Sequence, residues 1–307
     1  PVGKVLEEWE RPNGMRLQKI AVPLGVVGMI YESRPNVTVD ATGLCLKTGN
    51  AVMLRGGSDA LASNRQLVEV LQEGLRQAGM TDKAVYLVAT TDRQAVHEML
   101  QLRGYLDVII PRGGAGLIQR VVNESKIPVI ETGVGNCHLY IARSAPAEMA
   151  MALAVNAKTQ RPSVCNAIET LLVDKEWAEQ HLAELAAQLV EKSVLLKGCP
   201  KARELVPSME AATEEDWDTE YLDLVLAVKL VEDVDEAVAH INRHGTKHSE
   251  GIVTADDQEA ERFLQTVDAA VVYHNVSTRF SDGFEFGFGA EIGISTQKLH
   301  ARGPMGL

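Results

Sequence analysis

Hydrophobic runs of strand length alternate with amphipathic stretches along most of this chain. In each amphipathic stretch the apolar residues recur every three or four positions, which is the spacing of one helix face. A regular alternation of strands and helices is typical of parallel sheets that are covered by helices on both faces. The pattern therefore predicts an α/β protein built on doubly wound sheets.

Two series of alternating elements predict two domains. The first covers residues 21–130 and the second covers 131–282, with a Gly-rich return segment at 283–307. The acidic stretch 210–221 is expected to be a solvated loop. The first series predicts strands at 22–32, 51–55, 84–90, 106–111 and 127–132, and helices at 36–47, 58–78, 92–102 and 116–124. The second series predicts strands at 138–142, 167–173, 194–198, 223–231, 251–255 and 269–275, and helices at 146–158, 175–191, 234–243 and 256–266.

Residues 1–20 predict a separate β-hairpin. Two short runs that resemble strands flank the turn Arg11-Pro12-Asn13-Gly14, and an Asn-Gly turn of this kind favours a hairpin. A two-stranded ribbon is at best marginally stable by itself. We therefore expect the hairpin to pack on another surface.

Composition and charge limit the kind of partner. The chain has 307 residues, 46% hydrophobic and 23% charged, as in globular proteins. Its formal net charge of -12 argues against nucleic acid or an anionic membrane, but not against small anionic ligands. Four cysteines without C-x-x-C spacing predict neither a zinc ribbon nor a disulfide framework, so we expect a reducing cytoplasm. No apolar run reaches the roughly 18 residues of a membrane span, and no signal peptide is visible.

Cys165 is the candidate nucleophile. It lies in the run NAKTQRPSVCNAIETLLV, where Lys158, Gln160 and Arg161 precede it and an apolar strand-like run follows. Nearby cations favour the thiolate, which is the nucleophilic form of cysteine. The alternative is a small buried hydrophobic residue, as most free cysteines are. The density of polar and cationic neighbours favours the nucleophile.

Two glycine turns follow predicted strands of the first domain, and both are candidates for binding phosphate. Arg55-Gly56-Gly57-Ser58 opens a helix, where backbone N–H groups suit a phosphate, although Ser58 could equally be an N-cap. An arginine at a strand end, in place of an acidic residue, suits a 2′-phosphate and hence NADP. The second turn, Arg112-Gly113-Gly114-Ala115-Gly116, lacks the G-x-G-x-x-G spacing and the P-loop lysine. It fits a structural turn nearly as well.

Two polar residues lie at the ends of predicted elements. Glu131 ends an apolar strand before Thr132-Gly133, where a carboxylate could act as a general base or be ion-paired at a domain junction. Asn36 follows Arg34-Pro35. It could cap the helix at 36–47, or its amide could donate to an oxyanion.

Three histidines, His240, His244 and His248, are spaced like a metal-binding stripe. However, Gly245 should end their helix, and no carboxylate or cysteine completes a ligand set. We therefore expect no metal. We interpret the histidines as residues of a helix C-terminus, where the helix dipole favours cations.

Several runs together resemble the aldehyde dehydrogenase superfamily, and most closely its branch that reduces glutamyl phosphate in proline biosynthesis. The resemblance extends over nearly the whole chain. Its runs are VPLGVVGMIYESRPNVTVDA, CLKTGNAVMLRGG, IPRGGAGLIQ, PVIETGVGNCH, NAKTQRPSVCNAIETLLV, STRFSDG and GAEIGISTQKLHARGPMGL.

The resemblance implies a reaction, the NADPH-dependent reduction of L-glutamyl 5-phosphate to L-glutamate 5-semialdehyde with release of phosphate. Cys165 would attack the acyl phosphate to form a thioester, which hydride from the nicotinamide then reduces. Asn36 and the backbone N–H of Cys165 would form the oxyanion hole. Glu131 matches the general base of the superfamily, although the reductive direction needs no deacylating water.

The resemblance also implies binding residues. Cations suit a doubly anionic substrate, and the residues expected to bind it are Lys158, Arg161, Ser277 and Arg279. Glu220 would hold the nicotinamide ribose. The other cofactor-binding residues would be Arg34, Pro35, Arg55, Gly56, Gly57, Ser58, Gly113, Gly114, Ala115, Thr132 and Gly133.

The extent of the chain differs from the superfamily pattern. Members carry a helical segment before the residue where this chain begins, at Pro1 in place of Met, and a further strand after Leu307. We therefore expect a fragment, or a polypeptide without its ends. The hairpin resembles the dimerisation ribbon of the superfamily, which implies a homodimer or higher homo-oligomer. Two alternative functions are a non-phosphorylating aldehyde dehydrogenase, in which Glu131 activates water, and an inactive fragment with a role in assembly.

Overall fold

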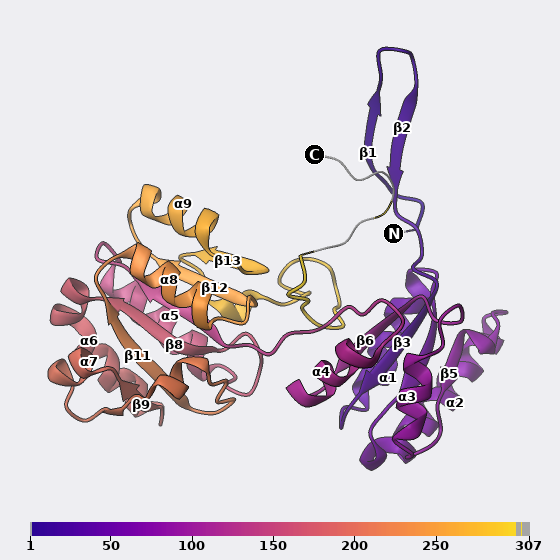
Figure 1. Cartoon of the computed structure of the whole chain (residues 1–307), viewed down its shortest axis with the longest axis horizontal. Helices are drawn as coiled ribbons and strands as arrows, with labels where there is room; N and C mark the ends of the chain where they lie inside the picture. The colour runs from indigo at the N-terminus through magenta and orange to yellow at the C-terminus, as the bar shows by residue number, and fades with distance from the viewer. Residues whose placement is uncertain (1, 299–301, 303–307) are drawn as a thin grey trace. The chain divides into compact units, whose positions relative to one another are not determined.

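The computed structural model describes residues 2–298 and 302, and these form two compact units (Figure 1). Unit 1 contains the described residues up to 132, together with 290–293, and unit 2 contains the rest. The last residues of the predicted return segment, 299–301 and 303–307, lie outside the described residues. Both units are α/β structures with parallel sheets, so the predicted fold class is confirmed.

The sheet of unit 1 has four parallel strands in the order β5-β4-β3-β6. The chain runs from β3 to β4 on one side and later returns to β6 on the other side, so its direction reverses between β3 and β6. Open α/β sheets bind ligands outside the carboxyl ends of their strands at such a reversal. The strands are β3 (Val26–Tyr31), β4 (Ala51–Arg55), β5 (Val85–Leu87) and β6 (Val108–Arg112).

Helices cover both faces of this sheet because side chains of β3 alternate between two cores. Met29 packs with residues of α1 and α2, whereas its neighbour Ile30 packs with residues of α3 and α4. Two short 3-10 turns, Ser58–Ala60 and Asp82–Ala84, flank the second helix. The helices are α1 (Asn36–Lys47), α2 (Leu61–Gln77), α3 (Gln94–Leu100) and α4 (Ala115–Glu124).

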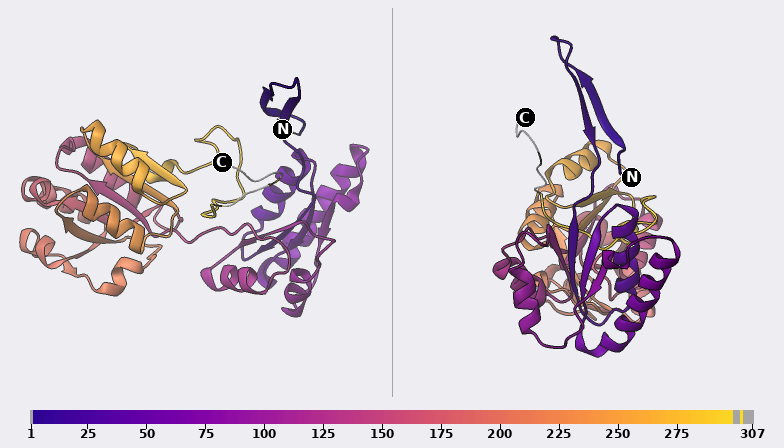
Figure 2. Two further views of the ribbon diagram at one scale, coloured as in Figure 1. Left: turned by 45° about the horizontal axis from the view of Figure 1, so that its top comes forward. Right: turned by 90° about the vertical axis from the view of Figure 1, so that its right-hand side faces the viewer.

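The predicted hairpin is present as β1 (Val5–Glu10) and β2 (Arg16–Ile20), which pair antiparallel and run side by side in Figure 2. Its apolar side chains remain exposed in this single chain, Trp9 at 44% and Leu6 at 53%. The expected packing surface for the hairpin is therefore still a prediction.

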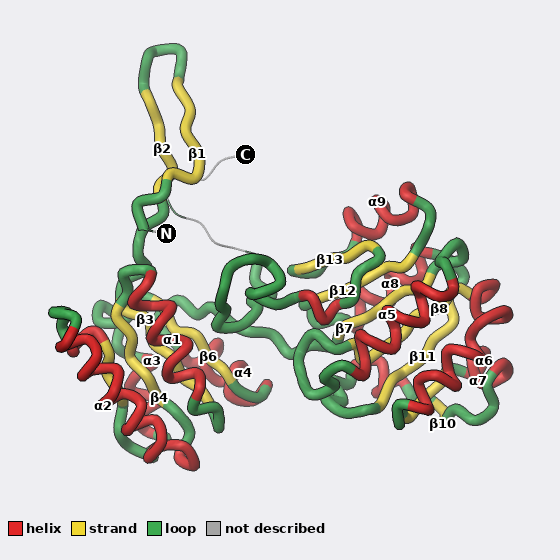
Figure 3. Tube along the Cα trace, turned by 180° about the vertical axis from the view of Figure 1, so that it is seen from behind, coloured by secondary structure: helices red, strands yellow, loops and turns green. Residues whose placement is uncertain are grey.

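Unit 2 contains seven parallel strands in the order β10-β9-β11-β8-β7-β12-β13. In Figure 3 this sheet forms one layer with helices on either side. Helices α5, α6 and α7 share one core with the sheet, and α8 and α9 share the other. The strands are β7 (Cys137–Ile141), β8 (Ile168–Asp174), β9 (Leu195–Gly198), β10 (Glu210–Ala211), β11 (Val225–Val231), β12 (Ser249–Val253) and β13 (Val271–His274). The helices are α5 (Ala147–Thr159), α6 (Lys175–Glu191), α7 (Pro200–Leu205), α8 (Val234–His244) and α9 (Asp257–Thr266).

Three local predictions were wrong. Residues 127–132 form no strand, only isolated bridges at Val129, which pairs with Ile109, and at Thr132, because Pro128 has no N–H to continue the ladder. The acidic stretch is no plain solvated loop, since it contains β10 and the turn Glu214–Asp218, where Asp216 is buried. Helix α7 was not predicted, because six residues are too short to show a helical period.

The histidine prediction holds for one residue of the three. His244 lies in the last turn of α8, with Nδ1 2.7 Å from Asp218 Oδ1. His240 is buried beside Lys229, and burial lowers the pKa of His240 to about 2, so it is a neutral core residue. His248 lies outside the helix, immediately before β12. Among residues 2–298 and 302, no group of three His, Cys, Asp or Glu side chains is placed to hold a metal.

No helix in the described part of the chain is long and apolar enough to cross a membrane.

Candidate active site

Cys165 lies between the end of α5 and the start of β8, at the amino edge of the sheet of unit 2. It is half-buried, whereas the other three cysteines of the chain are buried. Burial raises the pKa of Cys45 to about 11 and also raises that of Cys137, so both remain thiols. Because the thiolate is the nucleophile, accessibility selects Cys165.

The backbone at Cys165 is held from several sides. The Cys137 thiol donates to the Cys165 carbonyl oxygen at 3.1 Å. A Cβ atom on Gly135 would lie only 1.5 Å from the same oxygen, so this close approach requires glycine. On the other side, the Asn166 amide donates to the carbonyl of Ser281 at 3.0 Å, and the Thr278 hydroxyl donates to the carbonyl of Asn166 at 2.6 Å. The backbone of the candidate nucleophile is therefore fixed by these contacts.

One cation, Arg279, lies in electrostatic reach of the thiol, and a second, Arg161, lies in reach of Arg279. Burial lowers the pKa of Arg279, and a negative charge on Cys165 raises it again, whereas Arg161 lowers it further. Arg279 is half-buried, and its Nε donates to Gln160 Oε1 at 2.8 Å. Arg161 is exposed. Opposite charges at such a site favour a thiolate and attract anionic ligands.

Two residues expected to contact a substrate face the protein interior. The Lys158 side chain is fully buried, with its ammonium 2.5 Å from Glu169 Oε2. Ser277 is 1% exposed, and its hydroxyl accepts the N–H of Arg279 at the start of a 3-10 turn. Neither side chain is accessible to a ligand in this structure. The predicted substrate contacts of Lys158 and Ser277 therefore have no support in this structure.

Glu220 lies beside the nucleophile segment. Its Oε1 accepts the backbone N–H of Gly135 at 2.6 Å, and Gly135 packs directly on the carbonyl of Cys165. These three residues, distant in sequence, thus belong to one cluster at the amino edge of the sheet of unit 2.

Asn36 is the first residue of α1, and the N-cap position is occupied by Pro35. The interpretation of Asn36 as a helix cap is therefore wrong. Its Nδ2 donates to Asp40 Oδ2 at 3.0 Å, one turn along the helix. The side chain is exposed at the carboxyl end of β3, which is where open sheets bind ligands.

The turn after β4 holds a buried arginine. Arg55 is 8% exposed, and its two terminal nitrogens donate to backbone carbonyls, one of them that of Gly56. Its Nε is buried and has no hydrogen-bond partner among the described residues. Gly57, and not Ser58, holds the N-cap position of the following turn, without a side-chain hydrogen bond. The alternative that Ser58 is a plain N-cap is therefore wrong.

The turn after β6 is occupied by a carboxylate. Glu32, just beyond the end of β3, accepts the N–H of Gly114 at 3.0 Å. A Cβ atom on Gly113 would lie 2.4 Å from the same carboxylate oxygen. Because Gly114 is the N-cap of α4, the carboxylate of Glu32 is itself the negative charge at the positive end of that helix. This shows that the turn can receive a negatively charged oxygen.

The segment that leaves unit 1 contains the other predicted residues. Glu131 is half-buried, and the Thr132 hydroxyl is used by a hydrogen bond of 3.0 Å to the carbonyl of Pro111. A Cβ atom on Gly133 would lie 2.8 Å from the Thr296 side chain, so glycine permits a close approach there as well.

The sequence interpretation missed four residues of this arrangement, Glu32, Gly135, Cys137 and Glu169. All four lie inside the runs that carry the resemblance, but nothing local distinguishes them. Their importance comes from partners between 11 and 85 positions away.

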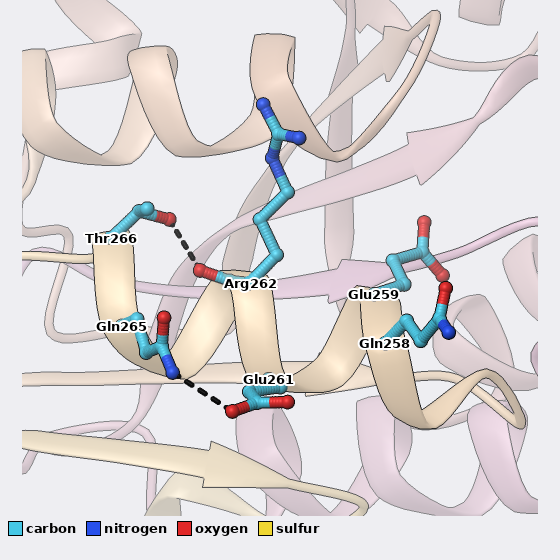
Figure 4. A pocket seen from close by; sticks show the side chains of 6 residues that line it. All are labelled: Gln258, Glu259, Glu261, Arg262, Gln265 and Thr266. Carbon is cyan, nitrogen blue, oxygen red and sulfur yellow. Dashed lines mark hydrogen bonds between the residues drawn. The ribbon is translucent and has the colours of Figure 1, made fainter.

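One surface depression of unit 2 lies along α9, away from Cys165 in sequence (Figure 4). Polar contacts there include a bond within the helix, from Gln265 to Glu261, and bonds that involve other elements, from Arg262 to Asp235 and from Thr254 to Glu259. The depression brings together no cysteine and no glycine turn, so we assign it no part in the site. Its lining residues are Gln258, Glu259, Glu261, Arg262, Gln265 and Thr266.

Comparison with known proteins agrees with this picture. The family model described as the aldehyde dehydrogenase family matches residues 3–197 and 211–291. The γ-glutamyl phosphate reductases of Moorella thermoacetica and Halalkalibacterium halodurans are each 60% identical to this chain over its full length. The matched region makes up 73% of the first protein and 74% of the second. A crystal structure of γ-glutamyl phosphate reductase from Thermotoga maritima superposes with a TM-score of 0.95 at 51% identity, covering 100% of this chain and 74% of that one. This chain belongs to the aldehyde dehydrogenase family.

Proposed function

We propose that this chain reduces L-glutamyl 5-phosphate to L-glutamate 5-semialdehyde and releases phosphate. The observation that carries the proposal is Cys165, the one accessible cysteine, on a fixed backbone near Arg279, which in turn lies near Arg161. The relatives described above, at 60% identity over the full length of the chain, are γ-glutamyl phosphate reductases. A nucleophilic thiol with adjacent cations is what capture of an acyl phosphate requires.

The chain's own residues account for the bond changes. The Cys165 thiolate attacks the acyl carbon, a C–S bond forms, and the C–O bond to phosphate breaks, so that phosphate leaves with the electron pair. Asn36 Nδ2 and the N–H of Cys165 are proposed to stabilise the oxyanion of this step. After reduction of the thioester carbonyl, the C–S bond breaks and the thiolate is regenerated. Arg161 and Arg279 are proposed to orient the phosphate or the α-carboxylate.

Members of the family use NAD or NADP, and we propose NADP for this chain. When bound, NADPH supplies the hydride. The residues present fit such a group: the α4 N-terminus after Gly113-Gly114 already holds an anionic oxygen, and Arg55 Nε is buried without a partner in the described part of the chain. We propose that these two places hold the pyrophosphate and the 2′-phosphate, and that Glu220 holds the nicotinamide ribose. Glu131 is proposed to guide protons near the thiol.

We expect Glu32→Gln to bind NADPH more tightly, because the Glu32 carboxylate competes with the pyrophosphate for the α4 N-terminus. The dissociation constant should fall about two- to fivefold, the equivalent of a typical interaction with a helix end. Titration of NADPH fluorescence measures it. Glu124→Gln, at the other end of the same helix, is the matched control for net charge and should bind as the parent chain does. Weaker binding by Glu32→Gln would instead make Glu32 a direct ligand of the cofactor.

The reverse reaction provides the direct test of function. We expect NADPH formation from glutamate 5-semialdehyde to require phosphate, or arsenate in its place, because an oxygen of that anion must attack the thioester. Rates are compared with and without phosphate at constant ionic strength. A non-phosphorylating dehydrogenase, in which Glu131 activates water, would run at the same rate in both. Absence of NADPH formation under both conditions would favour the alternative of an inactive fragment with a role in assembly.

We also propose that the hairpin of β1 and β2 contacts a second copy of the chain. Its apolar side chains Leu6, Trp9 and Ile20 are each more than 40% exposed in the single chain. Exposed apolar side chains of this kind in an isolated ribbon support an association surface.

A further inference from the structure

A fully buried ion pair lies in unit 2, between Lys158 and Glu169. Both side chains are 0% exposed, and Lys158 Nζ donates to Glu169 Oε2 at 2.5 Å. The pair joins α5 to β8, the two elements that flank Cys165. A buried ion pair of this kind adds little net stability, because removing two charges from water costs about as much as their attraction returns.

The second oxygen of Glu169 has a different partner. Glu169 Oε1 accepts the backbone N–H of Leu222 at 3.3 Å. Leu222 has a φ of 55°, a left-handed conformation that leucine rarely adopts and that its surroundings must impose. The side chain of Leu222 is 46% exposed, so packing does not impose it. The hydrogen bond to Glu169 therefore restrains this turn.

Tyr221 is restrained by the same charges and by a second ion pair. Two ammonium groups lie near its ring, with Lys158 Nζ at 6.0 Å and Lys197 Nζ at 5.3 Å from the centroid. Its hydroxyl donates to Asp216 Oδ1 at 2.8 Å, and Lys197 donates to the same oxygen. Cations at such distances over an aromatic ring attract it.

Glu220 immediately precedes these two restrained residues. No regular helix or strand contains residues 219–224, so side-chain contacts, together with the bond from the N–H of Leu195 to the carbonyl of Leu224, set the position of this loop. The Glu220 carboxylate reaches the N–H of Gly135 at 2.6 Å, next to the carbonyl of Cys165. A shift of the loop would displace Glu220 from this place.

We propose that Lys158 and Glu169 form a positioning pair that holds Glu220 in its cofactor-binding place through the N–H of Leu222. This inference rests on the proposed role of Glu220 as the ligand of the nicotinamide ribose. The pair acts through the loop and does not touch the cofactor. It explains why a lysine that precedes the nucleophile by seven positions is buried and does not face the substrate.

The pKa shifts of Glu169 and Lys158 show that burial disfavours the charged form of each side chain. Burial raises the pKa of Glu169 to about 7, and Lys158 opposes this rise. Burial likewise lowers the pKa of Lys158, against the attraction of Glu169. Charges held against such a desolvation cost are typical of functional positions.

Two double variants isolate the acceptor for Leu222. Lys158→Met with Glu169→Gln removes both charges but keeps an amide oxygen facing the loop, whereas Lys158→Met with Glu169→Leu removes the oxygen as well. Replacing a buried pair by neutral side chains of similar size usually preserves stability. We expect the leucine variant to bind NADPH about tenfold more weakly, the effect of losing an ordered charged contact. The glutamine variant should bind nearly as the parent chain does.

Two readouts separate positioning from general damage. NADPH affinity is measured by fluorescence titration, and the rate at which iodoacetamide alkylates Cys165 should be unchanged in both variants. Lys175→Met with Glu232→Leu, an exposed ion pair of the same unit, is the neutral control. Equal NADPH affinities of the two double variants, whether high or low, overturn the proposal. If either variant does not fold, hydrogen exchange of the Leu222 amide in the parent chain tests the same bond: slow exchange is expected, and exchange as fast as that of a solvent-exposed amide would overturn the proposal.

Glu220→Ala tests the proposed role of Glu220 separately from that of the Lys158–Glu169 pair. If it leaves NADPH affinity unchanged, the proposed role of Glu220 fails, and the positioning proposal fails with it. If Glu220→Ala weakens binding and the leucine variant does not, only the positioning proposal fails.

Discussion

Replacing Cys165 by alanine should abolish the phosphate-dependent formation of NADPH from glutamate 5-semialdehyde. Without the thiol no thioester can form, and the loss of a covalent nucleophile lowers kcat by about 10⁴-fold or more. The assay is the rate with saturating phosphate for the parent chain and the variant. Equal rates would exclude the thiol mechanism proposed above.

A matched control is available for this substitution. Cys199 is another free cysteine of the same unit, but it is buried and lies at the start of α7. Cys199→Ala should retain most of the activity. Alkylation at neutral pH gives an independent readout, because the burial that raises the pKa of Cys45 and Cys137 keeps both as thiols. We expect one modified cysteine, Cys165, located by peptide mass spectrometry, and inactivation in proportion to its labelling.

Asn36→Ala should lower kcat by about 10²- to 10³-fold, the usual effect of removing one oxyanion-hole donor. The KM for the semialdehyde should change little, because the amide is proposed to act mainly on the charge that develops in the transition state. Steady-state kinetics in the phosphate-dependent direction measure both constants. The isosteric variant Asn36→Asp, which lacks the N–H donor, should lose as much activity as the alanine variant.

Stability measurements separate this role from a structural one. Pro35 is the N-cap of α1, and Asn36 makes its hydrogen bond to Asp40 within the helix. Because alanine is the better helix former, Asn36→Ala should not lower the free energy of unfolding. A variant destabilised by about 1 kcal/mol with unchanged kcat would instead give Asn36 only a structural role, through its hydrogen bond to Asp40.

Much of the fold could be predicted from the sequence because its signals are local. The periods of 2 and 3.6 in the apolar residues mark strands and helices wherever one face is buried. The turn after Arg11 marked the hairpin, and the helix of residues 36–47 was predicted at its observed bounds. The misses follow from the same cause: Pro128 interrupts a run that otherwise has strand character, and α7 is too short to show a period.

The candidate site was only partly predictable from the sequence, because many of its contacts join residues that are distant in the chain. The polar and cationic neighbours of Cys165 in the sequence marked it as the candidate nucleophile, and Cys165 is also the one cysteine that is not buried. Lys158 has the same neighbours, yet it is buried against Glu169, because the register of α5 against β8 turns it inward. No pattern within a few residues can show which face of a helix a lysine near its end will occupy.

By itself, therefore, the sequence determined the class of fold, the family and the candidate nucleophile, since these depend on periodicity and on short motifs. The tertiary structure decided which charges are buried, that Glu32 occupies the α4 N-terminus, and that Glu220 meets Gly135 beside Cys165. These contacts join residues 82 and 85 positions apart. Contacts at such separations, and the desolvation that accompanies them, exist only once the sheets have assembled.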